Sequence, residues 1–314
     1  MCDQEKIRPR HHLLQNVVIR LLHDSSLLAR LYDQPHAVAV ELKLTAEEVG
    51  WLVAMDQRRW EIDSELPHRS LEGALSHCPV TGLVISSLCR QAQSLSTDLK
   101  SGVEELLSYY QSAAFHQCID QGAYLAESMM LWILQTITPR TPAALYRSQQ
   151  ISEALITLEY TLAVARRAQY MLIDDQPDMS LQDMDLSSVN LSLPLTSQIY
   201  TTSEGVVEVY LALYEEALRL TQAHGRAQLL KAQIDLEALP IKTGTSVTAL
   251  IQRGIDGVSV ETLSSGLAKA LNIARAGGSL TTLRQLLIDA EVESEDALEM
   301  IQGWVTEGLI TLTL

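Results

Sequence analysis

Apolar side chains recur every three or four residues along most of this chain, the spacing that places them on one face of an α-helix. Residues 11–32 show this spacing, with a break at Asp24-Ser25-Ser26. Longer helical patterns run through 82–134 and 143–173, and prolines in the segment 138–142 separate them, because proline disfavours helix in the residue before it. We therefore expect amphipathic helices packed as an antiparallel bundle.

Two stretches depart from the helical spacing. Between residues 186 and 210 apolar residues first alternate with polar ones, as they do in a half-buried strand. The alternating positions are Val189, Leu191, Leu193 and Leu195. The residues after them could form a hairpin flanking Ser203-Glu204-Gly205 or a helix from Val206, and we favour the helix. The terminal residues 308–314 alternate as well, and we expect a strand there.

Residues 241–314 have the pattern of a separate small domain. A turn over 242–245 precedes a helix expected at 247–253. A long helix is expected from near Val260, and Gly277-Gly278 should end it, since glycine is favoured just after a helix.

Two more amphipathic helices, around 280–287 and 297–305, complete this small domain before the final strand. Helix, turn, helix, the spacing Trp304-x-x-x-Gly308 and a strand together resemble a winged helix, which in biosynthetic proteins often recognises peptides. The sequence thus predicts a mainly all-α chain, with a helical bundle lobe over 1–235 and a small winged-helix-like lobe with a little β over 241–314.

The stretch from Leu42 to Ile85 holds the highest density of distinctive residues. Thr45 and Glu48 form a capping box, in which each side chain satisfies a backbone amide at a helix start, so a helix should begin near Ala46. Three residues supply the apolar stripe that we expect on this helix, namely Trp51, Leu52 and Met55.

A cluster of charged residues and one tryptophan comes directly after this helix. It consists of Asp56, Arg58, Arg59, Trp60, Asp63 and Arg69. Guanidinium groups bind carboxylates in a bidentate fashion, so the cluster could lock a helix–loop–helix corner with Trp60 as its plug. Tryptophan and arginine are also the residue types that anchor protein interfaces, so the same six residues are candidate partner-binding residues.

The same region carries a family resemblance. The pattern Asp-x-x-Arg-Trp-x-x-Asp at residues 56–63, followed by Arg69, a Leu-rich helix and the Pro79-Val80 step, resembles the helical partner subunit of methanobactin-type biosynthesis. The resemblance covers roughly residues 20–90. It implies a heterodimer with a multinuclear non-heme iron enzyme, to which the partner presents a precursor peptide for post-translational modification of cysteine residues.

The formal net charge of −16 argues against nucleic-acid and anionic-membrane partners, because neutralising phosphates requires clustered Lys and Arg. Five Asp and no basic residue fall within residues 174–185, which predicts a surface loop. The four cysteines show no Cys-x-x-Cys spacing, which indicates reduced thiols. No signal-like segment and no run of about 18 apolar residues occurs, so we expect a soluble, cytoplasmic protein.

Few residues offer chemistry of their own. A di-iron bundle needs Glu-x-x-His on two helices, and the only such spacing, Glu65 to His68, contains Pro67. His116, Asp120 and Glu127 could share one helix face, although a helical histidine beside carboxylates is more often hydrogen-bonded than a ligand. We therefore predict no catalytic residue and no cofactor or metal held by this chain, with iron expected in the partner enzyme.

Three classes of function remain open from the sequence. The first is a non-catalytic partner or scaffold of a peptide-modifying iron oxidase that binds the enzyme and the leader peptide, for instance by strand addition. The second is a winged-helix transcriptional regulator, which the seven acidic residues and the lack of Lys and Arg in 285–314 disfavour. The third is an all-α oxygenase-type enzyme, which the missing ligand set disfavours.

Overall fold

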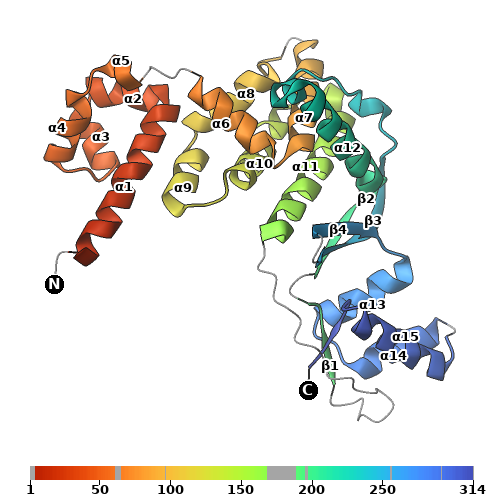
Figure 1. Ribbon diagram of the computed structural model, residues 1–314. Coiled ribbons are helices and arrows are strands. Elements are labelled where there is room, and N and C mark those ends of the chain that lie inside the picture. The colour runs from red at the N-terminus through yellow and green to blue at the C-terminus, as the bar shows by residue number, and fades with distance from the viewer. Residues whose placement is uncertain are drawn as a thin grey trace. The chain divides into compact units, whose positions relative to one another are not determined.

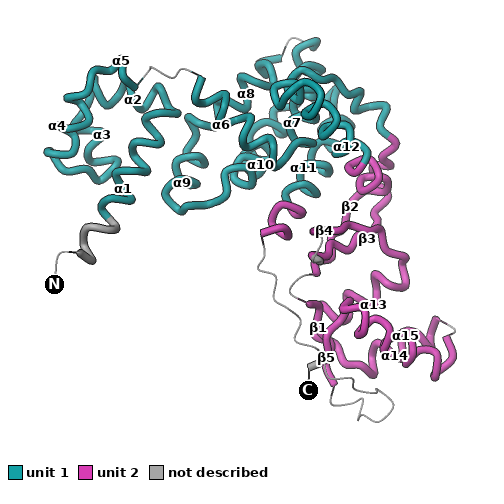
Figure 2. The backbone as a smooth tube through the Cα atoms, viewed as in Figure 1, with its two compact units in different colours: residues 1–160, 212–239 teal, residues 161–211, 240–314 magenta. Residues whose placement is uncertain are grey.

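The computed structural model describes residues 4–60, 65–95, 97–167, 189–194, 197–254, 257–290 and 292–313. This part of the chain contains fifteen α-helices, several short 3-10 helices and five strands in two small sheets, so the predicted mainly all-α class is confirmed (Figure 1). The chain divides into two compact units (Figure 2). Unit 1 comprises residues 1–160 and 212–239, and unit 2 comprises residues 161–211 and 240–314.

Unit 1 is built almost entirely of helices. They are α1 Gln4–His23, α2 Ser25–Asp33, α3 Pro35–Glu41, α4 Ala46–Ala54, α5 Gln57–Trp60, α6 Leu66–Leu75, α7 Pro79–Gln93, α8 Gly102–Ser108, η1 Tyr109–Gln111, α9 Ala113–Gln121, α10 Leu125–Thr136, η2 Thr138–Arg140, η3 Ala143–Leu145, most of α11 Tyr146–Arg167, the end of α12 Val206–His224, η5 Arg226–Leu230 and η6 Leu236–Ala238. The predicted helix starting at Val206 is confirmed.

Side chains at the helix starts explain where these helices begin. Asp24 accepts hydrogen bonds from the backbone N–H groups of Ser26 and Leu27 and so separates α1 from α2. Ser101 and Glu104 form a capping box at the start of α8. The fully buried carboxylate of Glu159 accepts hydrogen bonds from the backbone N–H groups of Val80 and Thr81 at the start of α7, at 3.1 and 2.6 Å.

Unit 2 contains two small sheets and three helices. Strand β1 Asn190–Ser192 pairs with β5 Thr311–Thr313, and the second sheet has the order β2-β3-β4, all antiparallel. The other elements are β2 Ser197–Glu204, β3 Lys242–Gly254, β4 Gly257–Thr262, α13 Ser265–Arg275, α14 Leu280–Asp289 and α15 Ser294–Thr306. The predicted helices in the last third are confirmed for α14 and α15, as is the terminal strand.

One helix prediction in this unit is wrong, and a second is wrong at its start but right at its end, where Gly277 follows α13 with a φ of +71°. The helix expected at 247–253 is part of strand β3, and Val260, expected to begin a long helix, lies in β4. The next helix begins only at Ser265, where Ser264 accepts a hydrogen bond from the Leu267 N–H. Pairing with β2 and β4 outweighs the helical spacing of the apolar residues in this segment.

The division of the chain also differs from the predicted lobes 1–235 and 241–314. Residues 189–204 were expected in the first lobe, but β1 and β2 pair with strands of the C-terminal segment. Val189 and Leu191 are buried in the same apolar cluster as Leu271, Leu283 and Ile301. Sheet pairing and core packing therefore assign this segment to unit 2.

Gly205 connects β2 to α12 in a conformation that requires glycine. Its φ is +90°, and a Cβ atom there would lie 2.4 Å from the carbonyl oxygen of Pro240.

Among the described residues, no helix combines the length and the apolar character that crossing a membrane requires. The acidic segment 174–185, predicted as a surface loop, lies outside the described residues.

Candidate functional site

The helix α4 begins where the capping box predicts. Thr45 is its N-cap, and the Glu48 carboxylate accepts a hydrogen bond from the Thr45 N–H at 2.7 Å. Arg10 binds the same carboxylate in a bidentate fashion, with Nε at 2.6 Å from Oε1. The Arg10 hydrogen bond is the main reason that the pKa of Glu48 falls to about 2, burial opposes this, and Thr45 adds to it.

The apolar stripe predicted on α4 is wrong for two of its three residues. Leu52 is buried, together with Val49. Trp51 of α4 and Met55, which directly follows the helix, are instead exposed, with 58% and 37% of their surfaces accessible. The helix therefore presents apolar side chains to solvent as well as to the core.

Trp60 lies at the end of α5 with its side chain in the core, 6% exposed. The indole Nε1 donates a hydrogen bond to the Tyr32 hydroxyl at 3.1 Å, and that hydroxyl donates to the Met55 carbonyl at 2.5 Å. Trp60 belongs to the same cluster of buried side chains as Leu21 and Leu28. These contacts support the interpretation of Trp60 as a plug.

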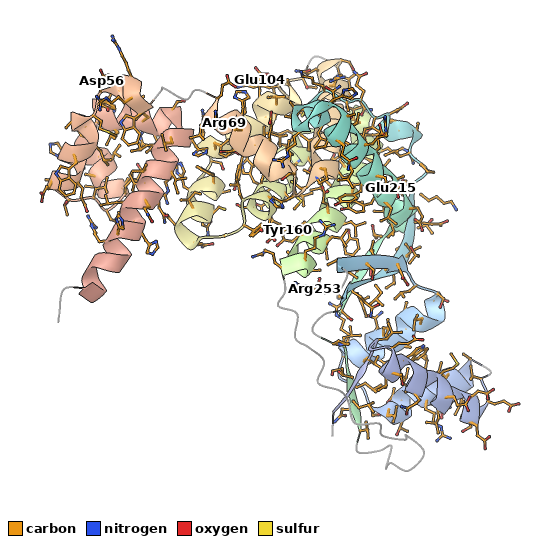
Figure 3. All side chains as sticks on the ribbon, viewed as in Figure 1. Asp56, Arg69, Glu104, Tyr160, Glu215 and Arg253 are labelled. Atoms are coloured by element: carbon orange, nitrogen blue, oxygen red, sulfur yellow. The ribbon has the colours of Figure 1, made fainter. Side chains whose placement is uncertain are left out.

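The charged members of the predicted cluster lie on the surface. Asp56, Arg58, Arg59 and Arg69 are all exposed. Figure 3 labels Asp56 and Arg69. The Asp56 carboxylate accepts a hydrogen bond from the backbone N–H of Arg58 at 3.0 Å and so begins α5. Asp63 lies outside the described residues. The structure thus separates the buried indole from the exposed guanidinium groups, which another molecule can reach from solvent.

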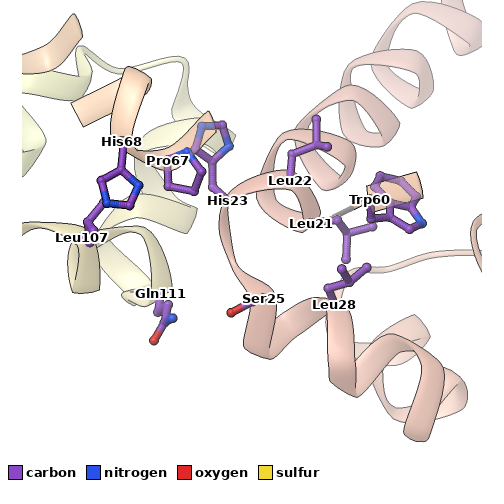
Figure 4. A pocket seen from close by; sticks show the side chains of 10 residues that line it. All are labelled: Leu21, Leu22, His23, Ser25, Leu28, Trp60, Pro67, His68, Leu107 and Gln111. Atoms are coloured by element: carbon purple, nitrogen blue, oxygen red, sulfur yellow. The ribbon is translucent and has the colours of Figure 1, made fainter. Parts of the chain in front are cut away.

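A pocket of about 360 Å³ adjoins Trp60 within unit 1. Figure 4 shows Leu21, Leu28 and Trp60 on one side and His68 and Leu107 on the other. His23 also lines it, with Nδ1 2.8 Å from the Ile19 carbonyl and Nε2 2.9 Å from the Ser70 hydroxyl. Burial lowers the pKa of His23, so its imidazole is neutral near pH 7. The lining is mixed, since polar Ser25 and Gln111 lie beside the apolar side chains.

The histidine and carboxylates predicted to share a face are distributed differently. His116 lies with its Nε2 3.1 Å from the Asp24 carboxylate, and Asp120 forms an ion pair with Arg20. Glu127 is buried on the next helix, α10. Burial raises the pKa of Asp24, but hydrogen bonds from His116, Ser26 and Leu27 outweigh it and lower the pKa overall.

This network joins α1 and α2 to α9. Its Asp24 and Arg20 members were not predicted, because they lie about a hundred residues away in the chain from their partners on α9. Asp24 carried one usable signal, its position as an N-cap. No cluster of three or more His, Cys, Asp or Glu side chains arranged for a metal ion occurs in the part of the chain that the structure describes.

Strand β4, where a helix was expected to begin, is a candidate binding element that the pattern of its residues did not predict. β4 is an edge of its sheet, since the described strands have the order β2-β3-β4. Its register pairs Gly257 with Gly254 and Thr262 with Ala249, and the N–H of Leu263 donates to the Thr248 carbonyl. In an antiparallel pair the backbone hydrogen bonds involve every second residue. Residues 257, 259 and 261 therefore bond to β3, and Val258, Val260 and Thr262 turn their backbone groups to the open side.

Comparisons with models of protein families, with curated proteins and with solved structures found no match.

Proposed function

We propose that this chain is a non-catalytic partner of a multinuclear non-heme iron oxidase, and that it holds a precursor peptide while the enzyme modifies the peptide's cysteine residues. The resemblance of residues 20–90 to the helical partner subunit of methanobactin-type systems suggests the enzyme. The observation that supports peptide binding best is the open edge of β4.

The β4 edge carries none of three features that commonly prevent strands from pairing there. Edge strands are commonly blocked by lysine, proline or a bulge. β4 has the sequence Gly-Val-Ser-Val-Glu-Thr and carries none of these. The other edge of the sheet, β2, has a register shift between Ser203 and Glu204. An extended peptide would therefore add to β4 in preference to β2.

Carboxylates near β4 favour a basic peptide. Glu261 is an exposed residue of the strand, and Glu208 accepts a hydrogen bond from the Thr262 hydroxyl at 3.3 Å. Electrostatic complementarity of this kind steers association and selects the partner. We also propose a cytoplasmic location, in keeping with the free thiols of Cys78, Cys89 and Cys118.

Proline at position 260 tests the peptide site. Val260→Pro removes an outward N–H group and leaves the β3–β4 hydrogen bonds intact, since proline is tolerated at an edge with its nitrogen toward solvent. The peptide would lose one backbone hydrogen bond to β4 and would meet the proline ring. Its binding should therefore weaken at least about tenfold. Val260→Ala keeps the N–H group and should change binding less than about threefold.

The measurement is fluorescence anisotropy with a labelled synthetic peptide that is basic and contains cysteine, together with co-purification with a multinuclear non-heme iron oxidase. Circular dichroism should show the same fold for both variants. Equal peptide affinity for Val260→Pro and the unchanged chain would exclude the β4 site. Failure to co-purify with the enzyme would exclude the partner assignment.

A further inference from the structure

The pocket beside Trp60 has the size of a site for a small molecule. Its volume is about 360 Å³, and its walls come from α1, α2, α5, α6, α8 and η1, all within unit 1. Pockets that bind small molecules are commonly of this volume or larger. The β4 edge belongs to unit 2, so a peptide added to β4 does not account for this pocket.

The lining favours a neutral ligand. None of the described residues around the pocket is Asp, Glu, Lys or Arg, although these four types make up 20% of the chain. His23 is also neutral near pH 7, because burial lowers its pKa. A charged ligand would therefore lose hydration in this pocket without meeting an opposite charge.

One carboxylate lies near the lining without being part of it. The Glu65 carboxylate is 3.8 Å from Nδ1 of His68, which lines the pocket. Because 73% of the Glu65 side chain is exposed, solvent screens its charge. Glu65 would at most favour a cation, so the neutral ligand has to be tested against a cationic one as well as an anionic one.

The apolar part of the lining offers ring surfaces. Leu21, Leu28 and Trp60 are at most 6% exposed, and Figure 4 shows them on one side of the pocket. The indole N–H of Trp60 is already donated to the Tyr32 hydroxyl. Both ring nitrogens of His23 are also engaged, by the Ile19 carbonyl and the Ser70 hydroxyl. These rings therefore present carbon atoms to a ligand, which suits an aromatic body.

Ser25 and Gln111 form the polar part of the lining. Within the described part of the chain, no hydrogen bond joins the Ser25 hydroxyl or the Gln111 amide to another group. In Figure 4 the Ser25 hydroxyl points toward the side of the pocket that carries Gln111. A hydroxyl and an amide each donate and accept hydrogen bonds, so a ligand group that does the same is complementary to them.

We infer that this pocket binds a neutral aromatic molecule that carries a carboxamide or a similar group able both to donate and to accept hydrogen bonds. The aromatic ring lies against Leu21, Leu28 and Trp60, and the polar group binds Ser25 and Gln111. This inference does not rest on the proposed enzyme partner or on the β4 site.

A series of probes with one ring system tests the charge preference. The probes are 2-naphthamide, 2-naphthoate and 2-naphthylmethylammonium, which share a naphthalene ring and are neutral, anionic and cationic at pH 7. Ligand-observed NMR with the full chain measures their affinities. We expect 2-naphthamide to bind with a dissociation constant below about 1 mM and at least about tenfold more tightly than either charged probe.

The indole N–H signal of Trp60 tests where the probe binds. In a spectrum of the chain labelled with ¹⁵N-tryptophan, the signals of Trp51, Trp132 and Trp304 are assigned by replacing each with Phe, which leaves Trp60. We expect 2-naphthamide to shift the Trp60 signal most, because Trp60 lines the pocket. The signal of Trp304, in unit 2, should stay unchanged.

Gln111→Leu tests the polar part of the pocket. The substitution removes the amide at an exposed position, so the melting temperature should change little. Affinity for 2-naphthamide should fall at least about threefold, since one hydrogen bond is lost. Gln117→Leu is the matched control, because Gln117 is also exposed but lies on α9, outside the lining.

Four results would overturn the inference. They are no binding of 2-naphthamide at about 1 mM, equal or tighter binding of a charged probe, a probe that leaves the Trp60 signal unchanged, and equal affinities for Gln111→Leu and Gln117→Leu.

Discussion

Trp60 stabilises unit 1 through both its ring and its indole N–H. Its side chain is 6% exposed, and it links α5 to α2 through the Tyr32 hydroxyl. Truncating a buried aromatic residue loses its transfer free energy and leaves a cavity. We expect Trp60→Ala to lower the free energy of unfolding by about 3–5 kcal/mol.

Trp51→Ala is the matched control, since the same substitution on an exposed side chain should change stability by less than about 0.5 kcal/mol. Urea denaturation followed by far-UV circular dichroism measures both variants. A small loss for Trp60→Ala would contradict its role as a plug and restore the possibility that it contacts a partner directly.

The sequence could identify α4 but not which of its faces points inward. The capping box of Thr45 and Glu48 marked the start of the helix, and this prediction is confirmed. Apolar residues occur all round the helix, at Val49, Trp51 and Leu52 among others, so their spacing alone does not distinguish the buried side. The inward face depends on contacts with α3 and α1, which are tertiary information.

At the scale of elements, Glu48 ties α4 to α1. Its carboxylate binds Arg10 and the Thr45 N–H, and its pKa is about 2 in the folded chain against an ordinary value of 4.5. Because the folded pKa lies below the unfolded one, the stabilisation is fully present above about pH 4.5 and is lost as the pH falls through about 2.

We expect Glu48→Gln to be less stable than the unchanged chain by about 2 kcal/mol at pH 7. The difference in stability should shrink steadily below pH 4.5, because the Glu48 carboxylate of the unchanged chain then takes up a proton when the chain unfolds. Unfolding free energies of both proteins at a series of pH values test this. Glu47→Gln, an exposed neighbour, should stay within about 0.5 kcal/mol throughout, and a constant gap for Glu48→Gln would refute the assignment.

The strands of unit 2 were harder to predict than its helices. The sequence at the β3–β4 connection includes Asp256-Gly257, a dipeptide typical of hairpin turns, and β3 holds Val247, Thr248 and Ile251, which favour strands. These signals were present in the sequence. The apolar residues of 247–253 also fit a helix, and short apolar runs do not separate the two.

At the scale of the whole chain, the two compact units differ from the predicted lobes for a topological reason. Strands β1 and β2 belong to unit 2. Residues 212–239, which hold the end of α12, belong to unit 1 and separate these strands in sequence from β3. A boundary predicted by following the chain in order assigns segments that are neighbours in sequence to the same domain. Pairing between Ser197 and Gln252, more than fifty residues apart, has no local signal.

The discontinuous unit 2 leads to a prediction about fragments. Residues 241–314 alone lack β2, which pairs along eight residues with β3, and lack the buried Val189 and Leu191. We expect this fragment to show poor dispersion in a ¹H–¹⁵N spectrum and no cooperative thermal transition, because its core and sheet are incomplete.

Joining residues 189–204 to residue 242 through a short Gly-Ser linker should restore both the spectral dispersion and the cooperative transition. Glu204 and Lys242 are neighbours in the sheet, with paired strands about 5 Å apart, so a short linker can span the gap. A cooperative transition in the fragment 241–314 alone would show that the C-terminal lobe folds without β1 and β2.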